Sequence, residues 1–188
     1  MDEELILDKK YGKHSGKKLK ILLEEETIKR RIKEIGREIT EEYQETENPP
    51  IVIGILNGSF IFMSDLVRAI NIDVEVDFMR IASYGNATST SGTVRMIKDI
   101  NCDITNRHVL VVEDIVDTGL SMNFLKNRLE QAGTKSLKFV SLLIKENTDV
   151  DFDMDYIGFE IPDKYVVGYG LDLAQKLRNL KSIYYIEQ

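Results

Sequence analysis

Apolar and polar residues alternate along the chain in patterns that predict several β-strands. The predominantly apolar runs at 51–56, 109–112 and 137–144 are rich in valine, isoleucine and leucine. Such runs are typical of parallel strands that are buried on both faces. Shorter strands are predicted at 19–23, 73–81, 94–97, 156–161 and 182–186.

Three other segments have the spacing of amphipathic helices. From Thr27 to Tyr43 apolar residues recur every three or four positions, and lysine, arginine and glutamate fill the remaining positions. The segments 60–70 and 122–132 are also predicted to be helical, and Gly133 is expected to end the second of them. Because strands and helices alternate through the middle of the chain, we expect an α/β fold with a twisted parallel sheet flanked by helices.

The predicted strand 109–112 leads into a segment of acidic and small polar residues. The segment comprises Glu113, Asp114, Asp117, Thr118, Gly119, Leu120 and Ser121. Ser121 is the expected N-cap of the next helix, so the segment is predicted to form a loop at the carboxyl edge of the sheet, where such folds bind ligands. The helix N-terminus and two hydroxyls suit a phosphate monoester, and the carboxylates suggest Mg²⁺. The alternative is an ordinary turn with acidic caps, which does not require three carboxylates within nine residues.

Composition and charge narrow the class of protein. The chain has 188 residues, of which 43% are hydrophobic, and a net charge of −7. The acidic balance disfavours non-specific nucleic-acid binding. A single cysteine, Cys102, cannot form an internal disulfide, and we find no signal peptide or membrane-spanning run. We therefore expect a cytoplasmic protein without nucleic-acid or membrane partners.

Polar residues at the ends of other predicted strands are further candidates for the site. Asn57 and Gly58 follow the strand 51–56, in a second strand–loop–helix unit. Ser83 and Tyr84 open a long stretch rich in glycine, serine and threonine, which is either disordered or a functional lid. Lys145 ends the strand 137–144. A lysine there is usually solvated or ion-paired, but this one is expected at the same sheet edge as the acidic loop.

The acidic segment also carries a resemblance to a known family. The run from Glu113 to Gly119 closely resembles the phosphoribosyl-pyrophosphate motif of the type I phosphoribosyltransferases, especially that of the hypoxanthine-guanine branch. Lys145 and the segment 159–172 also resemble that branch. The likeness extends from about Leu19 to Ile186. It implies the type I phosphoribosyltransferase fold, as a single domain over 1–188 with a core at about 45–145 and a hood formed by 1–44 and 146–188.

The resemblance assigns roles to individual residues of this chain. It implies that Asp117 is the catalytic general base at N7 of a purine and that Lys145 donates to the exocyclic oxygen of a 6-oxopurine. Many members have lysine where this chain has Asn57, and the family's frequent non-proline cis peptide would precede that residue. Ser83 and Tyr84 match the start of the family's lid. The remaining roles are phosphoribosyl-pyrophosphate and nucleotide binding by Glu113, Asp114, Asp117, Thr118, Gly119, Leu120 and Ser121; pyrophosphate binding by Asn57, Gly58 and Arg178; base binding by Lys145, Tyr165, Val166, Leu171 and Asp172; and metal binding by Glu113, Asp114 and Asp172.

The implied reaction is purine salvage. A 5-phosphoribosyl group passes from 5-phosphoribosyl 1-pyrophosphate to hypoxanthine or guanine, and the products are IMP or GMP and pyrophosphate, with Mg²⁺ as the cofactor. A homodimer or homotetramer is expected from the family. Two alternatives are a phosphoribosyltransferase for another base and a nucleotide-sensing regulator that binds RNA. The basic stretch at 9–20 is the only support for the regulator.

Overall fold

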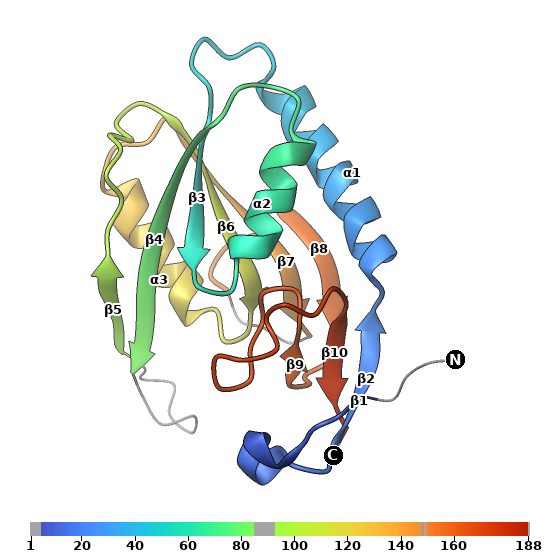
Figure 1. Ribbon diagram of the computed structural model, residues 1–188. Helices are drawn as coiled ribbons and strands as arrows, with labels where there is room; N and C mark the ends of the chain where they lie inside the picture. The colour runs from blue at the N-terminus through green and yellow to red at the C-terminus, as the bar shows by residue number, and fades with distance from the viewer. Residues whose placement is uncertain (1–4, 85–92, 147, 149, 188) are drawn as a thin grey trace.

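The computed structural model describes residues 5–84, 93–146, 148 and 150–187. Figure 1 shows helices around a twisted sheet, with a smaller sheet below it. The elements, in chain order, are β1 (Leu5–Ile6), the 3₁₀ helix η1 (Lys9–His14), β2 (Lys18–Leu23), α1 (Glu25–Tyr43), β3 (Ile51–Leu56), α2 (Phe60–Ala69), β4 (Glu75–Tyr84), β5 (Thr93–Lys98), β6 (His108–Val116), α3 (Leu120–Glu130), β7 (Ser136–Lys145), β8 (Tyr156–Ile161), β9 (Val166–Val167) and β10 (Ile183–Ile186).

The larger sheet has the strand order β5-β4-β3-β6-β7-β8. All neighbours in it are parallel except β4 and β5, which are antiparallel. The expected α/β fold is thus confirmed, with one antiparallel strand at the edge. Because β3, β6 and β7 run the same way, their carboxyl ends meet at one edge, and that edge faces the smaller sheet (Figure 1).

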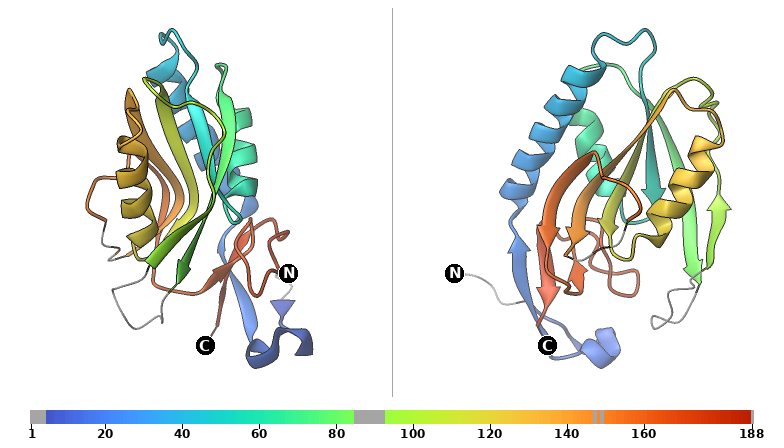
Figure 2. Two further views of the ribbon diagram at one scale, coloured as in Figure 1. Left: turned by 90° about the vertical axis from the view of Figure 1, so that its left-hand side faces the viewer. Right: turned by 180° about the vertical axis from the view of Figure 1, so that it is seen from behind.

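Alternating side chains of the central strands fill two separate cores. Ile51 and Ile53 pack with Leu125 of α3 on one face, and Val52 packs with Ile35 of α1 on the other. Figure 2 shows α3 on one side of the sheet and α1 and α2 on the opposite side. Alternate side chains of the strands therefore pack against the apolar faces of the helices, as the sequence patterns predict.

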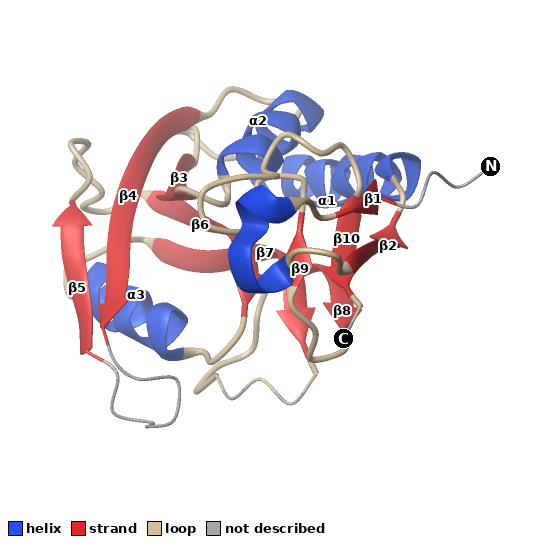
Figure 3. Cartoon of the chain, turned by 60° about the horizontal axis from the view of Figure 1, so that its bottom comes forward, coloured by secondary structure: helices blue, strands red, loops and turns tan. Residues whose placement is uncertain are grey.

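The smaller sheet has the order β1-β2-β10-β9 and joins the two ends of the chain. Its strands are antiparallel, and we call this sheet and the 163–182 segment the hood. Figure 3 shows it beside the carboxyl edge of the main sheet. Within the segments expected to form the hood, α1 packs in the main core and β8 extends the main sheet. The strand β1 and helix η1 are too short to leave a periodic pattern.

Three expected boundaries also differ from the structure. The strand β6 continues to Val116, because Glu113 and Ile115 pair with β7. Glu113 and Asp114 thus lie in a strand and not in the loop. The helix α3 begins at Leu120, and its N-cap is Gly119 (φ +73°), so the prediction of Ser121 as N-cap is wrong. A glycine at position 119 allows the left-handed turn that starts the helix earlier.

The helix α1 begins at Glu25 and not at Thr27. The backbone N–H of Glu25 donates to the hydroxyl oxygen of Ser182, at 3.1 Å. This acceptor comes from the far end of the chain, so local capping preferences at Thr27 did not indicate the true start. Among the described residues, no helix combines the length and the apolarity that crossing a membrane requires.

Candidate active site

Two cavities lie side by side at the carboxyl edge of β6. The first has a volume of about 210 Å³ and is lined by Asp114, Ile115, Asp117, Lys145, Lys164, Tyr165, Val166, Leu171 and Asp172. The second has a volume of about 290 Å³ and is lined by Glu113, Ile115, Val116, Asp117, Thr118, Gly119, Ser121 and Met122. Ile115 and Asp117 belong to both linings. A ligand that occupied both cavities would therefore pass beside the carboxylate of Asp117.

The lining of the first cavity includes one aromatic ring and several aliphatic side chains. Tyr165 is half exposed, and its hydroxyl donates to the backbone oxygen of Asp172 at 3.1 Å. Ile115 lines the same cavity from β6, while Val166 and Leu171 are buried behind it. The cavity thus offers apolar surfaces for a flat ring, with charged groups at its edges.

Lys145, together with Lys164, is one of two lysines that line this first cavity. Its Nζ lies 3.0 Å from Oδ1 of Asp117 and 2.8 Å from Oδ1 of Asp163. Burial alone would lower the pKa of Lys145, but the hydrogen bonds to the two carboxylates outweigh it and raise the pKa. Lys145 is therefore protonated at neutral pH. A side chain that recognises a carbonyl oxygen has to be a hydrogen-bond donor, and an ammonium group is one.

The second cavity lies at the N-terminus of α3. The first N–H groups of a helix have no acceptor within it, and they carry the positive end of the helix dipole. Thr118, Gly119 and Ser121 line the cavity around this point. The predicted phosphate site therefore has the required donors, although Glu113 and Asp114 approach from a strand.

Glu113, which is partly buried, and Asp114, which is buried, form an acidic pair at the end of β6. Burial raises the pKa of Glu113 well above its ordinary value, and the charge of Asp114 raises it further. Burial also raises the pKa of Asp114, although hydrogen bonds and Arg178 oppose the rise. The Oε2 atom of Glu113 is buried without a hydrogen-bond partner among the described residues. A buried oxygen without a partner is suited to accept a hydrogen bond from a ligand hydroxyl or to bind a cation.

The loop after β3 packs directly on this acidic pair. The peptide between Leu56 and Asn57 is cis, at the position expected from the family resemblance. A Cβ atom at Gly58 would lie 1.7 Å from Oδ2 of Asp114, so only glycine fits there. Ser59 is buried, and its hydroxyl donates to the backbone oxygen of Ile55 at 2.5 Å, which fixes the turn into α2.

Asp172 and Arg178 meet in the hood. Nη2 of Arg178 lies 2.7 Å from Oδ1 of Asp172, and Nη1 donates to the backbone oxygen of Gly170 at 2.6 Å. Oδ2 of Asp172 accepts from the backbone N–H of Gln175 at 2.7 Å. Both predicted residues are thus brought to the same edge as Asp114. A ligand that recruits either of them must compete with these bonds.

The fit of Mg²⁺ depends on the donors that the site offers. The described residues contain no group of three or more His, Cys, Asp or Glu side chains that could hold a metal by themselves. Mg²⁺ is commonly bound by one or two carboxylates together with water and substrate phosphates. The unpartnered Oε2 of Glu113 and the neighbouring carboxylate of Asp114 suit that mode of binding.

Comparisons with known proteins agree with this geometry. The phosphoribosyl transferase domain family matches residues 20–174. A hypoxanthine-guanine phosphoribosyltransferase of Aquifex aeolicus is 49% identical over 92% of this chain and 97% of its own length. One from Bacillus subtilis is 45% identical over 87% of this chain and 91% of its own length. The chain belongs to the hypoxanthine-guanine phosphoribosyltransferase family.

Solved structures of this family have the same fold. A hypoxanthine phosphoribosyltransferase of Staphylococcus aureus superposes with a TM-score of 0.84 at 40% identity, over 89% of this chain and 91% of that one. The Trypanosoma cruzi enzyme, solved in complex with the product IMP, has a TM-score of 0.81 at 40% identity, over 89% of this chain and 93% of that one. The type I phosphoribosyltransferase fold expected from the sequence is thereby confirmed.

Several residues of this phosphoribosyltransferase site were not predicted from the sequence. Asp163 pairs with Lys145 across 18 residues of chain, and Ile115 faces the first cavity. The hydroxyl oxygen of Thr148 lies 2.7 Å from the backbone oxygen of Lys145 and 3.0 Å from that of Asp117, so it ties two loops together. Of these residues, only Ile115 could have been predicted from the sequence. It lies two positions after Glu113, so on one strand the two side chains point to the same face.

The predicted lid falls mostly outside the described residues. Ser83 and Tyr84 are the last residues of β4, which ends at the same edge as β3. The stretch 85–92 is not among the described residues. The assignment of Ser83 and Tyr84 as the start of a lid therefore stays a prediction.

Proposed function

We propose that this protein is a purine salvage transferase that moves the 5-phosphoribosyl group of 5-phosphoribosyl 1-pyrophosphate to N9 of hypoxanthine or guanine. The products are IMP or GMP and pyrophosphate. The observation that carries the proposal is the pair of adjoining cavities that share Asp117. One cavity suits a flat base that accepts a hydrogen bond from lysine, and the other suits a phosphate.

The base occupies the first cavity. Its ring lies between Tyr165 and Ile115, and Lys145 donates to the 6-oxo group. An ammonium group only donates, so it favours a carbonyl oxygen over the amino group of adenine. The backbone of Val166, which is buried at the cavity wall, contacts the edge of the base in this proposal.

The phosphoribosyl group occupies the second cavity. The 5′-phosphate lies at the N-terminus of α3, against Thr118, Gly119, Leu120 and Ser121. Glu113 and Asp114 bind the ribose hydroxyls. Positive charge develops on the sugar as the bond from its C1 atom to the pyrophosphate oxygen breaks, and these carboxylates stabilise it.

Asp117 acts as the general base. It lies at the junction of the two cavities, and its side chain is 57% exposed, so an incoming base can reach it. The ion pair with Lys145 orients its carboxylate towards the base side. There it can accept the proton from N7 as N9 bonds to the sugar.

Residues for the leaving group and its metal surround the same point. Glu113 and Asp114 would hold one Mg²⁺ and Asp172 a second, and these ions would neutralise charge on the leaving pyrophosphate. Arg178 and the backbone of Asn57 and Gly58 contact the pyrophosphate itself. Because position 57 is an asparagine and not a lysine, this contact is made by backbone N–H groups.

A panel of bases tests the proposed reaction. The protein is mixed with 5-phosphoribosyl 1-pyrophosphate and Mg²⁺, and hypoxanthine, guanine, xanthine or adenine is added separately. Nucleotide formation and pyrophosphate release with the first two bases and not with adenine are expected. Turnover with xanthine or adenine alone would identify the protein as a phosphoribosyltransferase for another base. Binding of 5-phosphoribosyl 1-pyrophosphate without turnover would indicate a sensor.

The metal and the assembly need separate measurements. Turnover should disappear after chelation and return on addition of Mg²⁺. A homodimer or homotetramer, which the family resemblance supports, is measured by light scattering of the purified protein. The single cysteine is consistent with a cytoplasmic location.

A further inference from the structure

The hood contains a short arch in which three consecutive residues have a left-handed backbone. Gly168, Tyr169 and Gly170 have φ angles of +95°, +50° and +99°. Glycine adopts such angles freely, but a tyrosine does so at a cost of about 1 kcal/mol or more. The conformation of Tyr169 therefore has to be held by contacts that outweigh this cost.

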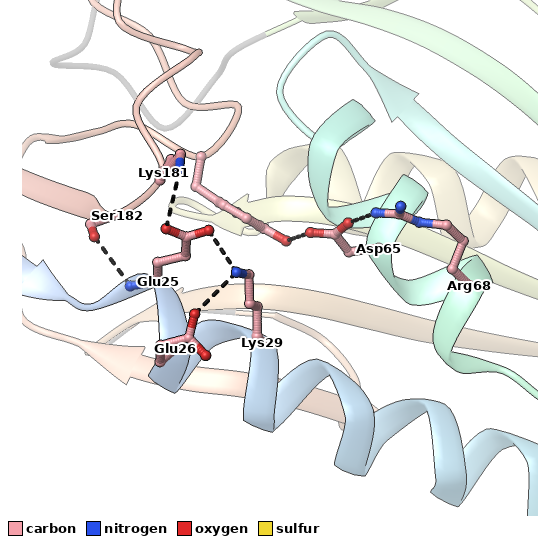
Figure 4. Close-up of polar contacts among 8 residues, drawn as sticks. Glu25, Glu26, Lys29, Asp65, Arg68, Lys181 and Ser182 are labelled. Carbon is pink, nitrogen blue, oxygen red and sulfur yellow. Dashed lines mark hydrogen bonds and ion pairs between the residues drawn. The ribbon is translucent and has the colours of Figure 1, made fainter.

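The side chain of Tyr169 is held by an acid on α2. The ring is only 4% exposed, and its hydroxyl donates to Oδ2 of Asp65. Arg68, one turn further along α2, contacts the other oxygen of Asp65 (Figure 4). Burial raises the pKa of Tyr169, and the Asp65 carboxylate raises it further, so the hydroxyl stays a donor at neutral pH.

The backbone of the arch touches the loop proposed for the pyrophosphate. A Cβ atom at Gly170 would lie 2.1 Å from the backbone oxygen of Gly58. The backbone oxygen of Gly170 also accepts from Nη1 of Arg178 at 2.6 Å. The arch therefore lies between the helix that carries Asp65 and two groups proposed to bind pyrophosphate.

The chain is tethered again just after it leaves this region. The hydroxyl oxygen of Ser182 accepts from the backbone N–H of Glu25, and Nζ of Lys181 lies 4.0 Å from the Glu25 carboxylate (Figure 4). The segment from 168 to 182 is thus fastened at both ends to helices of the main core. Of these two tethers, the one at Tyr169 is next to Gly58.

We propose that Tyr169 is a positioning residue for the phosphoribosyl-pyrophosphate site: its hydrogen bond to Asp65 holds the backbone of Gly170 against Gly58 and fixes Arg178. This inference rests on the proposed function. Tyr169 lines neither cavity. It acts through the backbone oxygen of Gly170, so its loss should weaken binding of the pyrophosphate donor more than binding of the base.

Three substitutions isolate the proposed hydrogen bond. Tyr169→Phe removes the hydroxyl and keeps the ring, Asp65→Ala removes the acceptor, and Asp65→Asn keeps an oxygen that can accept. The double variant Tyr169→Phe with Asp65→Ala measures the coupling between the two side chains. Tyr184→Phe is the matched control, because the Tyr184 ring packs in the hood and no hydrogen bond of its hydroxyl is found among the described residues.

The readouts are steady-state kinetics with each substrate varied and calorimetric binding of 5-phosphoribosyl 1-pyrophosphate with Mg²⁺. We expect Tyr169→Phe and Asp65→Ala each to raise the KM and Kd for this donor about tenfold, as loss of a hydrogen bond to a charged group does. The KM for hypoxanthine and kcat should change much less. The double variant should be no worse than either single one, and Asp65→Asn should retain most of the affinity.

Other outcomes would overturn the inference. An unchanged KM for the donor in Tyr169→Phe, whether or not the variant is less stable, would leave Tyr169 with a structural role only. Equal losses in Tyr184→Phe, or fully additive losses in the double variant, would also overturn it. A wild-type protein that neither binds the donor nor turns over would remove the proposed function and this inference together, whereas an active wild type with unaffected variants would remove the inference alone.

Discussion

Gly58 lies so close to Asp114 that a Cβ atom at position 58 would come within 1.7 Å of the Oδ2 atom of Asp114. On its other side, the backbone oxygen of Gly58 would be 2.1 Å from a Cβ atom at Gly170. The loop after β3 is thus confined between the acidic end of β6 and the hood. Three segments that are far apart in the chain meet there without room for one additional methyl group.

Gly58→Ala should therefore damage the site. The new methyl group has to displace the Asp114 carboxylate or the loop, which typically costs about 1–3 kcal/mol in a packed environment. We expect a lower kcat/KM for 5-phosphoribosyl 1-pyrophosphate together with a lower melting temperature. Steady-state kinetics and thermal unfolding measure the two effects.

Gly133→Ala is a suitable comparison for Gly58→Ala. Gly133 has a φ of +72° but no atom within 4 Å of its Cβ position. Its substitution should cost about 1 kcal/mol of stability through backbone strain and leave the kinetics unchanged. A Gly58→Ala enzyme with normal kinetics would mean that the loop can move away from Asp114 freely.

Asp117→Asn should slow the chemical step. An amide cannot take the proton from N7, and a positioned acid or base is typically worth about 10²–10⁴-fold in rate. We expect kcat to fall by that factor while the circular dichroism spectrum and the melting temperature stay close to those of the wild type. A kcat near the wild-type value would exclude Asp117 as the general base.

Asp163→Asn provides the matched control for Asp117. It removes the same charge from the other partner of Lys145, and its side chain is 79% exposed. Asp163 lines neither of the two cavities that meet at Asp117. Its substitution should therefore reduce kcat far less than Asp117→Asn does.

Lys145→Met should weaken recognition of 6-oxopurines. The substitution keeps most of the side-chain volume and removes the charged donor, which is worth about 1.5–3 kcal/mol in such a hydrogen bond. The KM for hypoxanthine and guanine should rise about 10- to 100-fold. Lys138→Met is the comparison, because Nζ of Lys138 pairs with Glu42 and the residue lines neither cavity. Equal effects of the two substitutions would contradict a specific role for Lys145.

Asp77 should give the protein a pH-dependent part of its stability. Its carboxylate accepts from the backbone N–H groups of Phe78, Asn101 and Cys102, at 2.7, 2.6 and 3.1 Å. Burial alone would raise the pKa of Asp77, but these backbone donors outweigh it and hold the pKa well below the ordinary 3.8. The contribution is therefore present above pH 3.8 and is lost as the pH falls below it.

Asp77→Asn should accordingly destabilise the protein by about 2 kcal/mol near neutral pH, because an amide replaces a charged acceptor. The difference from the wild type should shrink in urea unfolding experiments performed below pH 3.8. Asp73→Asn removes the same charge from an exposed position and should have little effect at either pH. A difference for Asp77→Asn that is constant with pH would contradict the depressed pKa.

Much of the fold could be predicted from local pattern alone. The runs at β3, β6 and β7 are apolar because both faces of these strands are covered, and α1 has one apolar stripe because only one face is buried. The extent of β6 could not be predicted in this way. Glu113 reads as the end of a strand, yet it pairs with Ser141 of β7, and the neighbouring strand decides where β6 ends.

The candidate site divides in the same manner. The acidic segment, Lys145 and Asp172 are recognisable because their residue types and local spacing, or their resemblance to a family, are contained in short stretches of chain. The residue that each of these side chains contacts cannot be recognised from such a short stretch. Asp163 beside Lys145 and Ser182 at the start of α1 are polar residues in unremarkable surroundings until the backbone brings them together.

The sequence by itself determined the alternation of strands and helices, the acidic and small-residue segment at the end of β6, and the class of ligand that this segment suits. Tertiary structure alone decided that Tyr169 reaches Asp65 and that Gly170 rests on Gly58. The reason is that hydrophobic period and turn preference act over a few neighbouring residues, whereas these contacts depend on how separate segments cross in space.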